Sequence, residues 1–207
     1  MKQIHLIFPH QLFENSPLIK INAPIYLVEE YLFFRHYPFH KQKIAFHRAT
    51  MKRYADFMIE DKHMEVHYIA TTDKISDIRE LLPELKKQGI SHINYIDPTD
   101  TWLSKRIEEG CEALGISLEC QENPMFLNTK EDLVSFFRKD KKKYHQTTFY
   151  KEQRKKRNIL IDPDGNPVGG KWTYDTENRK KYPAKKSPPA IQFPDVDAYY
   201  EEAKEYV

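Results

Sequence analysis

Short apolar runs alternate with longer amphipathic stretches through the first two-thirds of the chain. Five apolar runs are free of proline and glycine and have the length of buried strands; they cover residues 4–8, 25–28, 66–70, 93–96 and 116–120. The stretches at 39–60, 75–88 and 101–114 have helical spacing, and glycine follows the last two, as is common at helix C-termini. The pattern predicts strands alternating with helices.

Such alternation is typical of a parallel sheet with helices on both faces. We predict an α/β fold, a Rossmann-like doubly wound five-stranded parallel sheet over residues 1–122, followed by a basic, turn-rich C-terminal extension. The extension covers residues 123–184 and includes a basic helix near 149–157. Residues 185–207 are predicted to be a linker that ends in a short helix.

Charge is divided unevenly along the chain. The net charge is only +2, but residues 138–186 contain 16 basic and 6 acidic residues, a net +10, which leaves −8 for the rest. Such a split predicts that the C-terminal third meets a polyanion or an acidic protein surface. A solvated lysine-rich face without a partner is an equally good interpretation of the composition.

Several classes of protein are disfavoured. No stretch reaches the roughly 18 apolar residues of a membrane span, and no signal-type segment precedes the first strand, so a cytoplasmic protein is predicted. Cys111 and Cys120 form no CxxC or Cys/His cluster, which argues against a disulfide framework, a zinc site or an iron–sulfur site here. A histidine metal site is not expected, because Ile44 stands four residues after His40.

The motifs of several enzyme classes are missing from the sequence. The turn after the first strand is Phe-Pro-His-Gln, without the glycines that bring a GxGxxG loop close to a pyrophosphate, which disfavours a dehydrogenase. The GxxxxGK[ST], GxSxG and HExxH patterns do not occur either. We therefore assign no catalytic residue.

The second strand gives the clearest ligand-site signal. It ends in Glu29 and Glu30, and the helix that follows has basic side chains in its first turns. In an open α/β sheet, ligands bind at the carboxyl ends of the strands. A binding site at this edge is therefore the first hypothesis.

Two separated blocks of sequence resemble one known family. The first consists of Leu-Ile-Phe-Pro-His-Gln-Leu at 6–12, Val-Glu-Glu at 28–30, and the helix sequence at 40–56. The second consists of Phe-Tyr-Lys-Glu-Gln-Arg at 149–154 and Pro-Val-Gly-Gly-Lys-Trp-Thr-Tyr-Asp-Thr-Glu-Asn-Arg at 167–179, similar to FYREMR and PxGGxWNxDxENR signatures. Together they resemble the deoxyribodipyrimidine photolyase-related family, the iron–sulfur bacterial cryptochromes and (6-4) photolyases, over nearly the whole chain.

The resemblance implies an N-terminal antenna-type domain of a flavoprotein for light-dependent DNA repair or light signalling. Such a domain can hold 6,7-dimethyl-8-ribityllumazine, whereas FAD and a 4Fe-4S cluster belong to a following helical domain that this chain lacks. The chain by itself is then not catalytic, although complete family members resemble a DNA lyase. Expected partners are DNA, through the complete protein, and the missing helical domain; no membrane is expected, and the isolated domain could form a homodimer through the vacant face.

The resemblance also implies a set of chromophore-binding residues at the carboxyl edge of the sheet: Pro9, His10, Gln11, Glu29, Phe33, His40, Lys43 and His47. The chain departs from the family where Pro-His-Gln replaces Gly-Asp-Gln and where Phe33 replaces an acid. Phe33 could stack on a flat ring or fill the pocket. The alternative for Gln11 and Glu29 is strand-end capping, with Glu29 paired to Lys41 or Lys43.

The second block implies DNA contacts near the loop between the two domains. The residues expected to meet phosphates are Lys171, Asp175, Asn178, Arg179 and Lys180. The alternative is that Trp172 and Tyr174 hold the loop on the sheet domain and that Asp175 pairs with Arg179. The helix at 149–157 is expected to dock on the missing domain.

A second functional class stays open from the sequence. The chain could be a free-standing flavodoxin-like module that binds an anionic nucleotide or an acidic partner and performs no chemistry. Whether a photolyase or a photoreceptor is assembled, and whether an antenna binds, is not decided by the residues.

Overall fold

The computed structural model describes residues 2–175 and 179–207, and the chain divides into two compact units. The first unit is Met1–Leu127 with Pro194–Val207, and the second is Asn128–Phe193. Each unit has its own packing.

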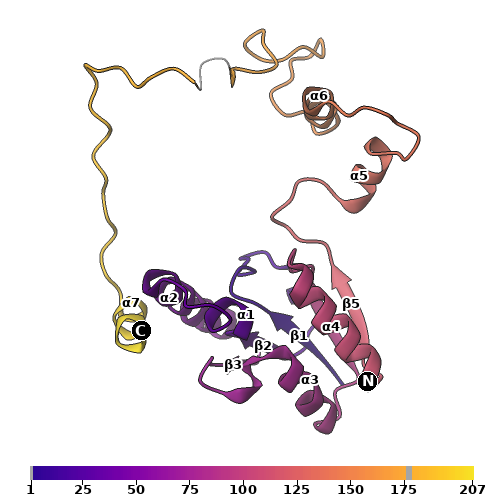
Figure 1. The fold of residues 1–207 in the computed structure, drawn as a ribbon, viewed down its shortest axis with the longest axis vertical. Helices are drawn as coiled ribbons and strands as arrows, with labels where there is room; N and C mark the ends of the chain where they lie inside the picture. The colour runs from indigo at the N-terminus through magenta and orange to yellow at the C-terminus, as the bar shows by residue number, and fades with distance from the viewer. Residues whose placement is uncertain (1, 176–178) are drawn as a thin grey trace. The chain divides into compact units, whose positions relative to one another are not determined.

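The first unit is built on a five-stranded parallel sheet (Figure 1). The strands are β1 (Gln3–Ile7), β2 (Ile25–Val28), β3 (Val66–Ile69), β4 (His92–Ile96) and β5 (Ser117–Gln121), in the order β3-β2-β1-β4-β5. Strand β1 is central, with Leu6 in register with Tyr26 on one side and Tyr95 on the other. The predicted Rossmann-like doubly wound α/β fold is confirmed.

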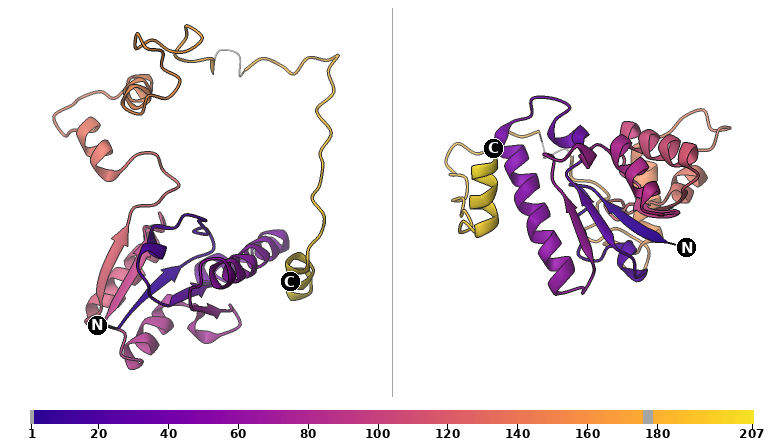
Figure 2. Two further views of the ribbon diagram at one scale, coloured as in Figure 1. Left: turned by 180° about the vertical axis from the view of Figure 1, so that it is seen from behind. Right: turned by 90° about the horizontal axis from the view of Figure 1, so that it is seen from below.

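Helices cover both faces of the sheet (Figure 2). Helix α2 (Lys41–Glu60) lies on one face, and α3 (Ile78–Lys87) and α4 (Thr101–Leu114) lie on the other. Successive strand residues point to opposite faces, so Leu6 packs with α3 and α4 whereas Ile7 packs with α2. Both faces of the sheet are therefore covered by helices. This burial on both sides explains why a strand run can be apolar throughout.

Short elements complete the connections of the first unit. Helix α1 (Tyr31–Phe34) follows β2, and the 3-10 helices η1 (Pro17–Lys20) and η2 (Lys74–Ser76) follow β1 and β3. Gly115 ends α4 with φ +61°, a left-handed conformation that favours glycine, as the sequence predicts.

The C-terminal helix α7 (Ala198–Tyr206) packs beside α2 (Figure 2). Ala203 is fully buried in this contact, and the Tyr199 hydroxyl donates a hydrogen bond to Asp56, 2.7 Å away. The predicted short terminal helix is therefore present, and residues 194–207 belong to the first unit.

The described residues of the second unit include two α-helices and a long loop region. Helices α5 (Lys130–Phe136) and α6 (Gln146–Lys156) are joined by aromatic packing, with the Phe136 and Phe149 rings 4.8 Å apart. Asp132, which completes a capping box at the start of α5, also pairs with Lys156 and Arg157 near the end of α6. A small aromatic cluster and one carboxylate thus hold the two helices together.

Within the described part of the chain, no helix combines the length and apolarity needed to cross a membrane.

Candidate functional site

The crossover direction of the sheet reverses between β1 and β4, which makes their carboxyl ends the topological switch point. Two side chains from the segment after β1 span this point. His10 Nε2 lies 2.9 Å from the Pro98 carbonyl oxygen, and Gln11 Nε2 donates to the Ile96 carbonyl oxygen at 2.9 Å. The switch point is therefore closed by protein hydrogen bonds.

His10 presents an unused acceptor beside this closure. Because the Pro98 carbonyl can only accept, Nε2 bears the proton of the neutral ring and Nδ1 keeps its lone pair. Nδ1 is buried without a hydrogen-bond partner, as is Oε1 of Gln11. Burial lowers the pKa of His10, outweighing the Pro98 carbonyl and the Asp100 charge, so the ring is neutral at pH 7.

A groove of about 720 Å³ lies between the segment after β1 and α2. Aromatic and aliphatic side chains form most of its wall, and its polar groups come from two histidines, Thr50, Tyr54, Glu14 and Arg53. The lining residues are Pro9, His10, Leu12, Phe13, Glu14, Phe46, His47, Thr50, Arg53, Tyr54, Phe57 and Met125. A largely apolar groove with a few polar groups is the usual form of a small-molecule site.

Three of the groove's polar side chains, His10, His47 and Tyr54, are neutral at pH 7. Burial lowers the pKa of His47, and the nearby Lys43 and His10 lower it further, so this imidazole is also neutral at pH 7. Burial raises the pKa of Tyr54, whose hydroxyl donates to the Phe13 carbonyl oxygen at 2.9 Å. His10, His47 and Tyr54 therefore offer neutral hydrogen-bonding groups among aromatic rings, beside the charged side chains of Glu14 and Arg53.

A second polar cluster surrounds Glu29 at the end of β2. The carboxylate is fully buried and accepts hydrogen bonds from Arg48 Nη1 at 2.9 Å, from the Thr71 backbone N–H at 2.7 Å and from the Tyr68 hydroxyl. Burial, reinforced by the Glu29 charge, raises the pKa of Tyr68 and keeps its hydroxyl protonated. Glu29 is thus a structural carboxylate, satisfied by its own protein.

Helix α7 completes the Glu29 cluster. Glu202 accepts from Arg48 Nε through both of its oxygens at 3.0 Å, and the Tyr206 ring lies against the Arg48 guanidinium, 3.8 Å from its centroid. Arg48 therefore links β2, α2 and α7.

The predicted chromophore-binding residues separate into three groups. Pro9, His10 and His47 line the groove, and Phe33 lies beside it, with its ring 4.9 Å from that of His10. Gln11 and Glu29 are fully buried and take the capping role of the alternative interpretation. The expected pairing of Glu29 with Lys41 or Lys43 is wrong, because Arg48 reaches it from the second turn of α2.

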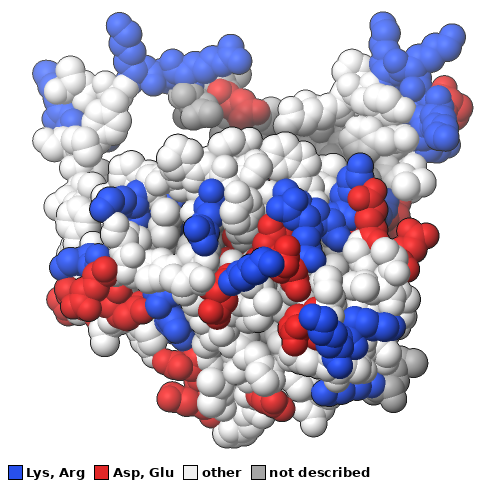
Figure 3. All heavy atoms as spheres, turned by 60° about the horizontal axis from the view of Figure 1, so that its bottom comes forward, with Lys and Arg blue, Asp and Glu red and all other residues white. Residues whose placement is uncertain are grey.

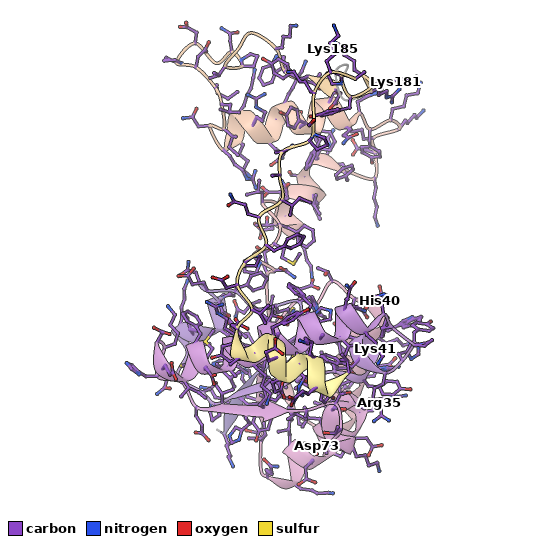
Figure 4. All side chains as sticks on the ribbon, turned by 90° about the vertical axis from the view of Figure 1, so that its left-hand side faces the viewer. Arg35, His40, Lys41, Asp73, Lys181 and Lys185 are labelled. Atoms are coloured by element: carbon purple, nitrogen blue, oxygen red, sulfur yellow. The ribbon has the colours of Figure 1, made fainter. Side chains whose placement is uncertain are left out.

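His40 and Lys43 lie outside the groove lining. His40 is exposed and caps α2 by accepting from the Gln42 backbone N–H, and Figure 4 shows it with Arg35 and Lys41 along one edge of the first unit. Lys43 lies over the Phe39 ring, 3.4 Å from its centroid. Acidic and basic side chains are interspersed over the face shown in Figure 3.

Sequence reasoning did not include several groove residues. Leu12 and Phe13 follow the predicted turn directly, and Thr50, Tyr54 and Phe57 lie three or four residues apart along α2. That spacing places them on one helix face with His47, a signal that was available in the sequence. Met125, which comes after β5, had no such signal.

The predicted DNA-contacting residues all belong to the second unit. Lys171, Asp175, Arg179 and Lys180 are exposed, whereas Asn178 lies outside the described residues. Trp172 packs with α6 of the same unit, with the Arg154 guanidinium 5.3 Å from its ring centroid. Tyr174 donates a hydrogen bond to the Gly169 carbonyl oxygen at 3.1 Å.

The two cysteines do not form a cluster site. Cys111 is buried in α4, where burial raises its pKa to about 12, and Cys120 is exposed in β5. Since the whole sequence contains only these two, it cannot supply the four thiolates of a 4Fe-4S cluster.

Comparison with known proteins gives a consistent result. The family model described as deoxyribodipyrimidine photo-lyase-related protein matches residues 5–207. An uncharacterized protein, R852, of Acanthamoeba polyphaga mimivirus is 37% identical over 196 residues, which is 89% of this chain and 97% of that protein. A (6-4) photolyase of Agrobacterium fabrum is 24% identical over 147 residues, which is 68% of this chain but only 28% of that enzyme.

Proposed function

This chain belongs to the deoxyribodipyrimidine photo-lyase-related protein family, and from that premise we propose that it is an antenna-type module which binds 6,7-dimethyl-8-ribityllumazine. The observation that supports the proposal is the apolar groove beside β1, whose lining includes His10, a neutral imidazole with a buried Nδ1 that has no hydrogen-bond partner. The volume of about 720 Å³ lies in the range of small-molecule sites.

The hydrogen-bonding and aromatic groups of the groove fit a flat heteroaromatic ligand. The imide N–H and the ribityl hydroxyls of a lumazine can donate, and neutral His10 Nδ1 can accept. Aromatic side chains on α2 and in the segment after β1 offer faces for the ring, with Phe57 and Phe13 among them. A bound lumazine would supply light absorption; the protein residues would orient it and exclude water.

The light-dependent reaction itself is proposed for a complete protein. A 4Fe-4S cluster would belong to a further helical domain, because this chain lacks the cysteines for it, and we propose that FAD binds in that domain as well. We propose DNA repair or light signalling as the activity of that assembly, with this chain as a non-catalytic module. A cytoplasmic location and a homodimer of the isolated module stay predictions.

The basic second unit is proposed to contact the phosphates of DNA. The residues assigned to this contact are Lys171, Asp175, Arg179 and Lys180, which are exposed, and Asn178, which lies outside the described residues. The separation of a +10 segment from a −8 remainder supports the assignment.

The alternative is a free-standing flavodoxin-like module that binds an anionic nucleotide or an acidic partner. The mimivirus relative is of matching size, since the alignment covers 97% of that protein's length. Flavin mononucleotide then becomes the appropriate competitor of the lumazine in a binding assay.

The test is a fluorescence titration of the chain with 6,7-dimethyl-8-ribityllumazine, FMN and FAD in turn. Saturable lumazine binding is expected, and Thr50→Trp, which fills the groove, should weaken it by at least about ten-fold, equivalent to ~1.4 kcal/mol. Ile59→Trp is the matched control, because Ile59 is exposed on the same helix but does not line the groove. Lumazine binding that Thr50→Trp leaves unchanged would contradict the groove assignment, and preference for FMN would favour the alternative.

A further inference from the structure

The second unit contains a pocket of about 390 Å³ between α6 and the loop that follows it. Three aromatic side chains, Tyr150, Trp172 and Tyr174, form part of its wall. The other lining residues are Gln146, Thr147, Arg154, Leu160, Val168, Thr173 and Asp175. The pocket therefore combines flat apolar surfaces with amide, hydroxyl and carboxylate groups.

Arg154 fixes the loop that closes this pocket. Its buried guanidinium donates to the carbonyl oxygens of Ile159 at 3.0 Å and Trp172 at 3.4 Å, and also to that of Leu160. Tyr174 is held in turn by its hydrogen bond to Gly169. The aromatic walls thus belong to a preformed site, anchored to α6.

Positive charge surrounds the aromatic wall. The Nζ atoms of Lys151 and Lys155, one turn apart on α6, each lie 5.4 Å from the Trp172 ring centroid. Exposed Lys171 precedes Trp172 in sequence. Residues 128–193 contain 17 basic and 8 acidic residues, a net +9, so an anion is attracted to the whole unit.

We propose that this pocket binds an unpaired base of single-stranded DNA. Aromatic faces stack on any base, and lysines beside them neutralise the flanking phosphates. The Gln146 amide and the Asp175 carboxylate supply donors and acceptors for a base edge. The volume of about 390 Å³ is within the usual range for small-ligand sites.

This inference rests on the proposed contact of the basic unit with DNA and adds base recognition to it. Phosphate contacts alone would not distinguish a strand with bases from one without them. Stacking in the pocket predicts tighter binding of the strand with bases, because an abasic strand has the charge but no ring to insert.

The experiment uses the Trp102→Phe variant, which leaves Trp172 as the single tryptophan of the chain. Its fluorescence is titrated with an oligothymidylate of about ten nucleotides, a site size usual for such surfaces, and with an abasic strand of equal length. Saturable quenching is expected, with binding of the oligothymidylate about ten-fold tighter than binding of the abasic strand.

Tyr174→Ala locates the binding, with Tyr37→Ala as its matched control, since both tyrosines are 54% exposed and Tyr37 belongs to the first unit. Tyr174→Ala should reduce affinity for the oligothymidylate about ten-fold and leave the abasic strand unaffected. Equal binding of the two strands by the parent protein would overturn the base pocket while leaving the phosphate contact intact. Binding of neither strand would overturn both proposals. The strand comparison needs no pocket variant, so a folding defect of Tyr174→Ala does not obscure it.

Discussion

Loss of the Arg48 side chain should destabilise the first unit, because it removes the ion pair of a buried carboxylate. Its side chain is 10% exposed, and its partner Glu29 is fully buried. Replacement by methionine keeps most of the aliphatic volume but leaves the Glu29 carboxylate without a positive charge. Breaking a buried ion pair in this way costs ~3–5 kcal/mol, because one charge stays buried and uncompensated.

The destabilisation expected for Arg48→Met lies in the lower part of the range for a broken buried ion pair. Glu29 keeps the Tyr68 hydroxyl and the Thr71 backbone N–H as donors after Arg48 is lost. The contact to Glu202 adds little, since that carboxylate is 45% exposed and screened by water. We therefore expect Arg48→Met to lower the free energy of unfolding by about 3 kcal/mol, and the midpoint of thermal unfolding by roughly 6–12 °C.

The assay is urea-induced unfolding at pH 7, followed by circular dichroism. Arg53→Met is the control on the same helix, because its pair with Asp197 is 3.5 Å long and its side chain 74% exposed, and it should cost no more than about 1 kcal/mol. Adding Glu29→Gln to Arg48→Met should restore part of the loss, since no buried charge is then left unpaired. A loss for Arg48→Met no larger than for Arg53→Met would refute the reasoning.

Three further predictions concern the same unit. Burial raises the pKa of Glu30 from 4.5 to about 7, so the folded state holds this proton more tightly than the unfolded chain. The contribution of this proton to the free energy of unfolding is complete below pH 4.5 and is lost, by about 3 kcal/mol, as the pH rises through 7. Glu30→Gln should remove this pH dependence of the free energy of unfolding, measured by urea titrations at pH 5 and pH 8. An unchanged pH dependence would count against the burial argument. Gln11→Ala removes the donor to the Ile96 carbonyl oxygen and should cost about 1–3 kcal/mol in thermal unfolding, whereas a neutral effect would mean that the switch point is closed by other contacts. Gly115→Ala should cost about 1 kcal/mol, because φ is +61° while the nearest atom to an added Cβ is 3.9 Å away; unchanged stability in the same assay would show that the helix end adapts.

The sequence was sufficient for the five strands and the long helices of the sheet domain, but the stretch predicted as one helix at 75–88 is divided into η2 and α3, and the short α1 was not predicted. Strand β2 and helix α4 begin and end where the pattern predicts, because burial on both strand faces and helix capping leave local signatures. The candidate site was predicted less completely. His10 and His47 line the groove, whereas Gln11 turns toward Ile96, 85 residues away.

The sequence by itself thus determined the α/β class, the family resemblance and the charged second segment, since each is a property of neighbouring residues or of composition. Only the tertiary structure decided that Arg48, and no lysine of α2, pairs with Glu29, and that α7 returns over 154 residues to place Glu202 against Arg48. The reason is physical: local periodicity fixes which face of an element is buried, whereas the partner of a buried charge depends on which distant elements are packed against that face.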